Sequence, residues 1–319
     1  MGRCLVTGAN GFIGSSILSK INSSDHIFIG LSSSIVAPSI INCDLFNKEK
    51  LRRALINVDC IIHCAGYISS ERMETSKEVE KHWHINYEGS KNLLDIACDL
   101  GVKQFINLSS VKVMGNVGEF CANESYCGEP KTSYAKSKLA FERILSRYSA
   151  ERKISAVNLR LSMVYGRGSK GNLTKMIKAV KSGIFPPIPE TGNHRSLIHV
   201  DDVVRAVKLV LFNSKANGSS YILTGPTSPS GRQLYNSIRV ALNLSPLHFC
   251  LPATLLWSIA WLCEILQYLF LKKLPYNIDA LERLLRSEWY SSKKIEDELG
   301  WIAEVNLDAG LKESLNFSE

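Results

Sequence analysis

Short apolar runs alternate with stretches of helical periodicity through the first half of the chain. This alternation is typical of a parallel β-sheet covered by helices on both faces. Strands are predicted near Arg3–Thr7, His26–Ser32, Ile40–Asp44, Cys60–Ala65, Gln104–Ser110 and Ser155–Leu161. Helices are predicted near Lys48–Ile56, Ser76–Leu100 and Ser133–Ser149. The pattern therefore predicts an α/β fold with a Rossmann-type doubly wound parallel sheet.

The pattern changes after Tyr165, where glycines and then prolines interrupt the chain up to Pro189. A helical pattern resumes over Asp201–Phe212. We therefore assign residues 1–165 to a Rossmann domain, to which 195–226 is expected to return. Residues 166–194 and 227–319 are expected to form a smaller, mostly helical substrate-binding part.

One long apolar segment, Leu251–Leu271, has Glu264 and Gln267 as its strongly polar side chains and is followed by Lys272 and Lys273. About twenty apolar residues can span a bilayer, but a charge in the middle of the segment disfavours that interpretation. The first interpretation is a helix buried in the C-terminal part or in a dimer interface. The alternative is a helix lying on a membrane surface, which would give peripheral membrane contact.

Composition narrows the classes of partner. The 38 basic and 30 acidic side chains leave a formal net charge of +8, spread along the chain. This excess suits an anionic ligand or an acidic membrane surface, but it lacks the clustered basic stripe of nucleic-acid binding proteins, so no nucleic-acid partner is expected. The nine cysteines are scattered without metal-ligand spacing, which predicts reduced thiols, no metal site and a cytoplasmic protein. No secretory signal precedes the first glycine-rich turn.

A glycine-rich turn follows the first predicted strand and opens a helix: Gly8-Ala9-Asn10-Gly11-Phe12-Ile13-Gly14. Small residues let the backbone approach a pyrophosphate, whose charge is met by the N–H groups at the start of the helix. A strand before the turn and a helix after it are the context that a dinucleotide-binding motif requires. The residues expected to contact the cofactor here are Gly8, Asn10, Gly11, Phe12, Ile13 and Gly14.

The end of the second predicted strand bears on the choice of cofactor. Ser32 and Ser33 stand where an NAD-binding chain usually carries a carboxylate for the ribose hydroxyls. Small hydroxyl residues leave room for a 2′-phosphate, which favours NADP(H), although no nearby Arg or Lys supports it and NAD(H) stays possible. After the third strand, Asp44 and Leu45 either contact the adenine or form an ordinary turn.

Tyr134 and Lys138 are four residues apart on a predicted helix, and therefore lie on one helix face. A phenol has a pKa of about 10, so a neighbouring ammonium that favours the phenolate would bring it into the range of acid–base catalysis. Ser110, at the end of a predicted strand, would hydrogen-bond the same substrate oxygen. We predict Ser110, Tyr134 and Lys138 as the catalytic residues.

Together these motifs resemble the extended short-chain dehydrogenase/reductase family, which includes sugar-nucleotide epimerases, dehydratases and ketoreductases. Further matching segments are His63-Cys64-Ala65-Gly66, Asn86-Tyr87-Glu88-Gly89, the serine strand from Leu108 to Gly115, and Arg160 to Gly166. The resemblance implies that Cys64, Ala65, Gly66, Tyr134 and Lys138 contact the dinucleotide. It implies that Ser110, Lys112, Asn172 and Arg195 contact a UDP-linked sugar, and that Asn86 has a structural role.

The resemblance is greatest to 4-ketoreductases of the UDP-N-acetylquinovosamine type, which implies reduction of the C4 ketone of a UDP-4-keto-6-deoxy-N-acetylhexosamine for surface polysaccharide synthesis. The alternatives are a UDP-hexose or UDP-N-acetylhexosamine 4-epimerase and a catalytically silent dinucleotide-binding scaffold. Val111 stands where dehydratases of the family carry a carboxylate, which argues against elimination of water. Met114, Arg167 and Ser291 replace the usual tyrosine, proline and aspartate. A homodimer through the helices near 76–100 and 133–149 is also implied.

Overall fold

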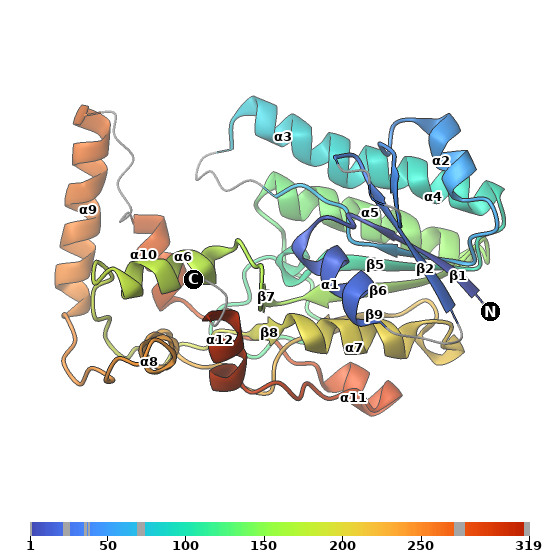
Figure 1. Cartoon of the computed structure of the whole chain (residues 1–319). Helices are drawn as coiled ribbons and strands as arrows, with labels where there is room; N and C mark the ends of the chain where they lie inside the picture. Colours follow the sequence, from blue (N-terminus) through green and yellow to red (C-terminus); the bar gives the residue numbers. More distant parts are fainter. Residues whose placement is uncertain are drawn as a thin grey trace.

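A seven-stranded parallel sheet forms the centre of the molecule (Figure 1), in the order β3-β2-β1-β4-β5-β6-β9. The computed structural model describes residues 2–21, 26–34, 37, 39–68, 74–270 and 278–315. The strand order reverses between β1 and β4, and ligands of doubly wound sheets bind at such a reversal, beyond the carboxyl ends of the strands. The predicted Rossmann-type α/β fold is confirmed. The strands are β1 (Gly2–Thr7), β2 (His26–Ser32), β3 (Ile40–Asn42), β4 (Cys60–His63), β5 (Gln104–Ser110), β6 (Ser155–Leu161) and β9 (Ser220–Leu223).

Helices cover both faces of the sheet because the strands are apolar on both sides. In β1, Cys4 and Val6 enter one buried cluster, whereas Leu5 enters the other. Burial in either cluster removes apolar side chains from water. This stabilises the fold by roughly 1.5–3 kcal/mol for each fully buried large aliphatic side chain. The first cluster is covered by α1 (Phe12–Lys20), α7 (Val200–Val210) and α11 (Lys293–Leu299). The second is covered by α2 (Lys48–Ala54), α4 (Ser90–Asp99) and α5 (Ser133–Ala150).

A smaller, mostly helical assembly lies beside the carboxyl ends of the strands (Figure 1). It contains a two-stranded parallel sheet of β7 (Met163–Tyr165) and β8 (Leu197–His199). Its helices share a third buried cluster. They are α6 (Asn172–Lys181), α8 (Gly231–Ala241), α9 (Ala253–Phe270), α10 (Ile278–Leu285) and α12 (Leu307–Leu315). Among the described residues, no helix has the length and apolar character needed to cross a bilayer.

The predicted helix Ser76–Leu100 is divided in the structure. It consists of α3 (Ser76–Trp83), a π-helical turn (His84–Gly89) and α4. A π turn carries an extra residue within a helix, often near a functional site. Here the turn contains Asn86, whose buried side chain hydrogen-bonds the backbone that follows β4. Of the predicted helix Leu251–Leu271, α9 covers residues 253–270, and Leu271 lies outside the described part.

Candidate active site

The glycine-rich turn is packed so closely that side chains cannot be added to it. Gly8 has a φ of +65°, and a Cβ there would lie 2.8 Å from the Ala65 nitrogen. A Cβ on Gly14 would lie 2.3 Å from the Gly8 carbonyl oxygen. Gly11 is the exposed N-cap residue of α1 and supplies no side chain to cap the helix. The backbone N–H groups of Phe12 and Ile13, which are the first of α1, are therefore well placed to bind an anion.

Hydrogen bonds connect the turn to the end of β2. The Asn10 amide donates to the Ser32 hydroxyl at 2.7 Å, and the Ser34 backbone N–H also donates to that hydroxyl. Ser33 is exposed beside them. Asp44 instead accepts the backbone N–H of Phe46 at 2.9 Å, as in an ordinary turn.

Leu45 is 8% exposed and belongs to the buried cluster under α2 and α4. The structure therefore places both serines predicted for the cofactor at the end of β2 next to the turn, with Ser32 buried (7% exposed) and Ser33 exposed. It places Leu45 mostly in the core.

The chain after β4 is held against the turn and against α5. The Ala65 N–H donates to the Thr7 hydroxyl at 3.1 Å. Asn86 accepts the Tyr67 N–H at 2.7 Å, donates to the Tyr67 carbonyl at 2.9 Å and lies 3.4 Å from the Ser137 hydroxyl. These bonds position the Cys64–Gly66 segment. The contacts of Asn86 are structural in character, as the resemblance implies for this residue.

His63 links three elements below this segment. Its two ring nitrogens lie 2.8 Å from the hydroxyls of Thr7 and Ser90. Burial lowers the pKa of His63 to about 3, so the ring is neutral at physiological pH. A neutral imidazole between two hydroxyls can donate from one nitrogen and accept at the other. His63 therefore fixes β1, β4 and α4 relative to one another.

Ser110, Tyr134 and Lys138 meet at the carboxyl end of β5. Tyr134 hydrogen-bonds Ser110, and Lys138, 5% exposed, donates from Nζ to the Leu108 carbonyl at 2.7 Å. Helix α5 begins directly before Tyr134, because the Thr132 hydroxyl accepts the Ala135 N–H. The three predicted catalytic side chains are thus brought together, within reach of the Cys64–Gly66 segment.

The sequence predicts that Lys138 lowers the pKa of the Tyr134 phenol. The structure gives a different result for both side chains. Burial raises the pKa of Tyr134, and the hydrogen bond with Ser110 opposes this rise. Burial also lowers the pKa of Lys138 to about 8, against the attraction of Glu142. The Lys138 ammonium is directed to the Leu108 carbonyl. In this structure Tyr134 is therefore a protonated phenol, which can donate a proton.

Residues that the sequence motifs did not indicate support the phenol. The His82 ring, 1% exposed, lies 5.9 Å from the Tyr134 ring, and its Nδ1 lies 2.6 Å from the Ser133 hydroxyl. The Glu74 carboxylate accepts the Ser133 N–H at 3.0 Å from each oxygen. These contacts join α3 to the start of α5. No sequence motif marks them, because the two partners are far apart in the chain.

Two of the predicted substrate residues converge on a carboxylate that was not predicted. Lys112 pairs with Glu288, and the Arg195 guanidinium lies 3.8 Å from the other oxygen of the same carboxylate. Arg195 also donates to the Arg286 carbonyl at 3.4 Å. Asn172 is exposed in the first turn of α6. The structure thus gathers Lys112 and Arg195 into one charged group around Glu288.

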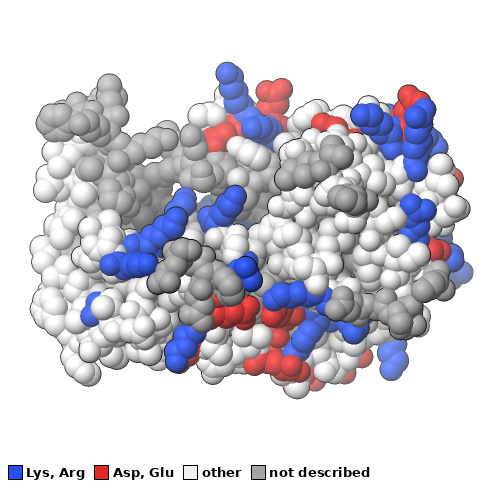
Figure 2. Space-filling model, viewed as in Figure 1, with Lys and Arg blue, Asp and Glu red and all other residues white. Residues whose placement is uncertain are grey.

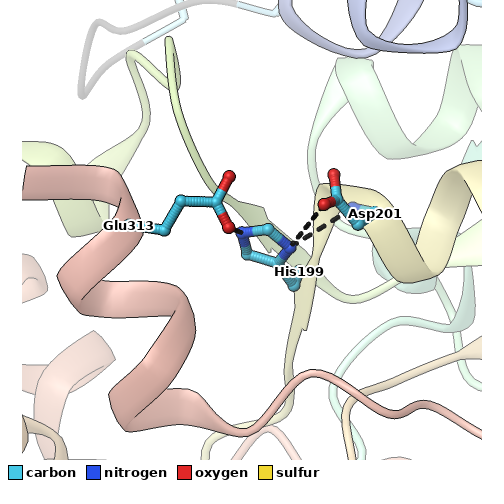
Figure 3. A group of neighbouring side chains, drawn as sticks. All are labelled: His199, Asp201 and Glu313. Carbon is cyan, nitrogen blue, oxygen red and sulfur yellow. Dashed lines mark hydrogen bonds and ion pairs between the residues drawn. The ribbon is translucent and has the colours of Figure 1, made fainter. Parts of the chain in front are cut away.

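A second charged group surrounds His199 (Figure 3). Asp201 approaches His199 Nδ1 at 4.0 Å, and Glu313 approaches Nε2 at 3.8 Å. Lys20 pairs with Asp201 and lies 3.9 Å from Glu313. The two carboxylates face opposite edges of the ring, and the Lys20 ammonium lies near both. This group ties α12 to α1 and α7.

Comparisons with known proteins identify the family and the fold of this chain. The model of the NAD dependent epimerase/dehydratase family matches residues 4–223. A UDP-glucose 4-epimerase from Vibrio cholerae is 25% identical over 97% of this chain and 93% of its own length. An N-acetyl-alpha-D-glucosaminyl-diphospho-ditrans,octacis-undecaprenol 4-epimerase from Escherichia coli O157:H7 is 23% identical, over 98% and 94% respectively. The solved complex of the Thermus thermophilus UDP-glucose 4-epimerase with NAD superposes with a TM-score of 0.74, at 24% identity over 98% of both chains.

Proposed function

This chain belongs to the NAD dependent epimerase/dehydratase family, and from that premise we propose that it is an NAD(P)-dependent oxidoreductase acting at C4 of a UDP-linked sugar. The proposed reaction is reduction of the C4 ketone of a UDP-4-keto-6-deoxy-N-acetylhexosamine for surface polysaccharide synthesis. The observation that carries the proposal is the hydrogen-bonded pair of Tyr134 and Ser110, next to Lys138 and the glycine-rich turn.

The residues around the turn fit a dinucleotide. The space at Gly8 and Gly14 excludes any Cβ, and the start of α1 has no side-chain cap. A pyrophosphate would be held by these N–H groups, and the nicotinamide ribose by Tyr134 and Lys138. When bound, the cofactor supplies the hydride that adds to C4. NADP(H) is favoured because Ser32 and Ser33 bring no negative charge to the end of β2; NAD(H) is the alternative.

Proton transfer is the task of the chain itself. Tyr134 is protonated, so it can donate its proton to the C4 oxygen as the ketone becomes an alcohol. Ser110 hydrogen-bonds the phenol and stands where it can also hold that oxygen. The same phenol, once deprotonated, would accept the proton if a sugar alcohol were oxidised, so both C4 reactions can use it. Lys112 and Arg195 would bind the diphosphate of the substrate, in competition with Glu288.

Replacement of Tyr134 by Phe tests the mechanism. The Tyr134→Phe protein is expected to lose roughly 10²–10⁴ in kcat, because the proton donor is gone. Tyr148→Phe is a matched control, since that phenol also donates a hydrogen bond, to Asp95 at 2.8 Å. Turnover is measured with the UDP-4-keto-6-deoxy-N-acetylhexosamine and NADPH. Near-normal turnover of Tyr134→Phe would refute the assignment.

A 4-epimerase is the second candidate, since all three proteins compared above are named as 4-epimerases. The E. coli O157:H7 relative is named for a sugar on undecaprenyl diphosphate, and the exposed apolar face of α9 favours such a lipid-linked substrate here. Peripheral membrane contact is part of this candidate, and a homodimer through α3, α4 and α5 is proposed for both. UDP-N-acetylglucosamine without reductant separates the reactions, because only an epimerase yields the C4 epimer by product NMR with no net consumption of NADPH.

A further inference from the structure

Helix α9 lies at the edge of the molecule farthest from the large sheet (Figure 1) and exposes apolar side chains there. Of its described side chains, Leu256 and Ala260 are buried in the cluster shared by the smaller part. The large apolar side chains exposed on it are Leu255 (45%), Trp257 (37%), Ile259 (37%), Trp261 (61%) and Leu262 (53%). An apolar surface of this extent on a folded protein marks an interaction site.

The width of this face indicates what kind of partner it fits. Successive residues of a helix are about 100° apart around its axis. Seen along that axis, the exposed side chains lie within an arc of roughly 200°, which Trp257 and Ile259 bound. The seam of a helix packed on another helix is only about 100° wide. One polar side chain within the arc, Ser258, donates its hydroxyl to the Thr254 carbonyl at 3.0 Å. A broad uncharged arc with two tryptophans is typical of a helix lying in a membrane interface.

A basic surface lies beside α9. Lys175, Lys178 and Lys181 are exposed on α6, which has no acidic residue. The opposite side of α6 packs in the same buried cluster as Leu256 and Ala260 of α9. In Figure 2, Lys and Arg side chains gather over the position of α6, whereas the described part of α9 carries no charge in this view. Apolar and basic surfaces are thus adjacent on the smaller part.

We propose that α9 docks in the headgroup layer of an anionic lipid bilayer, with the three α6 lysines against the lipid phosphates. A second copy of the chain fits less well, because a two-fold contact between these faces would bring the α6 lysines of both copies together. The inference rests on the proposed function in one respect: for the 4-epimerase candidate, docking would bring the active site to a sugar carried on a polyprenyl diphosphate. The docking itself does not depend on turnover.

Flotation of the full-length protein with vesicles tests the proposal. Binding is expected to vesicles of phosphatidylcholine with phosphatidylglycerol, to weaken with added salt, and to be much weaker with phosphatidylcholine alone. Trp257→Ser/Trp261→Ser is expected to lower the partition coefficient by at least about tenfold. Phe120→Ser/Ile302→Ser is the matched control, because these side chains are also exposed, at 53% and 58%, but lie elsewhere.

The charge contribution is tested separately. Lys175→Gln/Lys178→Gln/Lys181→Gln is expected to lose on the order of 100-fold in partition to the anionic vesicles. Lys48→Gln/Lys50→Gln/Lys77→Gln removes three exposed lysines outside the smaller part and should bind normally. Tyr134→Phe should also bind normally, so loss of turnover and loss of docking are distinguishable. Failure of the wild type to float overturns the proposal, and so does a tryptophan variant that only changes from dimer to monomer in sedimentation.

Discussion

The glycine-rich turn yields the sharpest prediction, because Gly14 faces backbone atoms that have little freedom to move. In Gly14→Ala the new Cβ would lie 2.3 Å from the Gly8 oxygen and 2.8 Å from the Gly8 carbonyl carbon. An ordinary carbon–oxygen contact is about 3.3 Å or longer, so the turn must open by about 1 Å. Overpacking of this kind costs about 1–3 kcal/mol, and the better helix propensity of alanine offsets about 1 kcal/mol of it.

The effect on the cofactor should exceed the effect on stability. Charge-assisted hydrogen bonds from the turn to a pyrophosphate contribute about 1.5–3 kcal/mol each, so loss of one weakens binding by roughly 10- to 100-fold. NADPH and NADH affinities are measured by calorimetry, beside urea unfolding. Gly171→Ala is the matched control, because its φ is −77° and its nearest neighbour atom lies 3.7 Å from the added Cβ. Unchanged cofactor affinity in Gly14→Ala would show that the pyrophosphate does not bind at this turn.

Two further predictions concern the charged groups. Because burial lowers the pKa of Lys138 from 10.5 to about 8, the folded state releases this proton before the unfolded state does, and its contribution to stability rises between about pH 8 and pH 10.5. The free energy of unfolding, measured with urea, should therefore be higher at pH 9.5 than at pH 7.5, by no more than about 3 kcal/mol, and Lys138→Met should lack this increase. An equal increase in both proteins would contradict the buried ammonium. Glu288→Gln should bind UDP several-fold more tightly by calorimetry, since Lys112 and Arg195 lose a competing carboxylate. Glu282→Gln is its control, and weaker binding by Glu288→Gln would exclude a diphosphate site there.

The fold and the centre of the site could be predicted because their signals are local. The strands before Gly8 and at Ser110, and the four-residue spacing of Tyr134 and Lys138, lie within short stretches of sequence. Periodicity alone did not divide Ser76–Leu100, because no glycine or proline lies between α3 and the π turn to mark the boundary.

Contacts between distant segments could not be predicted. Glu288 meets Lys112 across 176 residues, and His82 meets Ser133 across 51. The charge state of Tyr134 depends on where the Lys138 ammonium points. Spacing places both side chains on one helix face, but it does not reveal that the ammonium donates to the Leu108 carbonyl.

The network of Lys20, Asp201 and Glu313 also bears on biosynthesis. Helix α1 is made early, yet its last residue, Lys20, pairs with Asp201 and lies 3.9 Å from Glu313. A ribosome adds about 5–20 residues per second, so tens of seconds separate translation of Lys20 from that of Glu313. During that interval α1 has been synthesised, but Glu313 of α12 has not. Helix α1, which follows the glycine-rich turn, therefore reaches its final packing only after residue 313 has been translated.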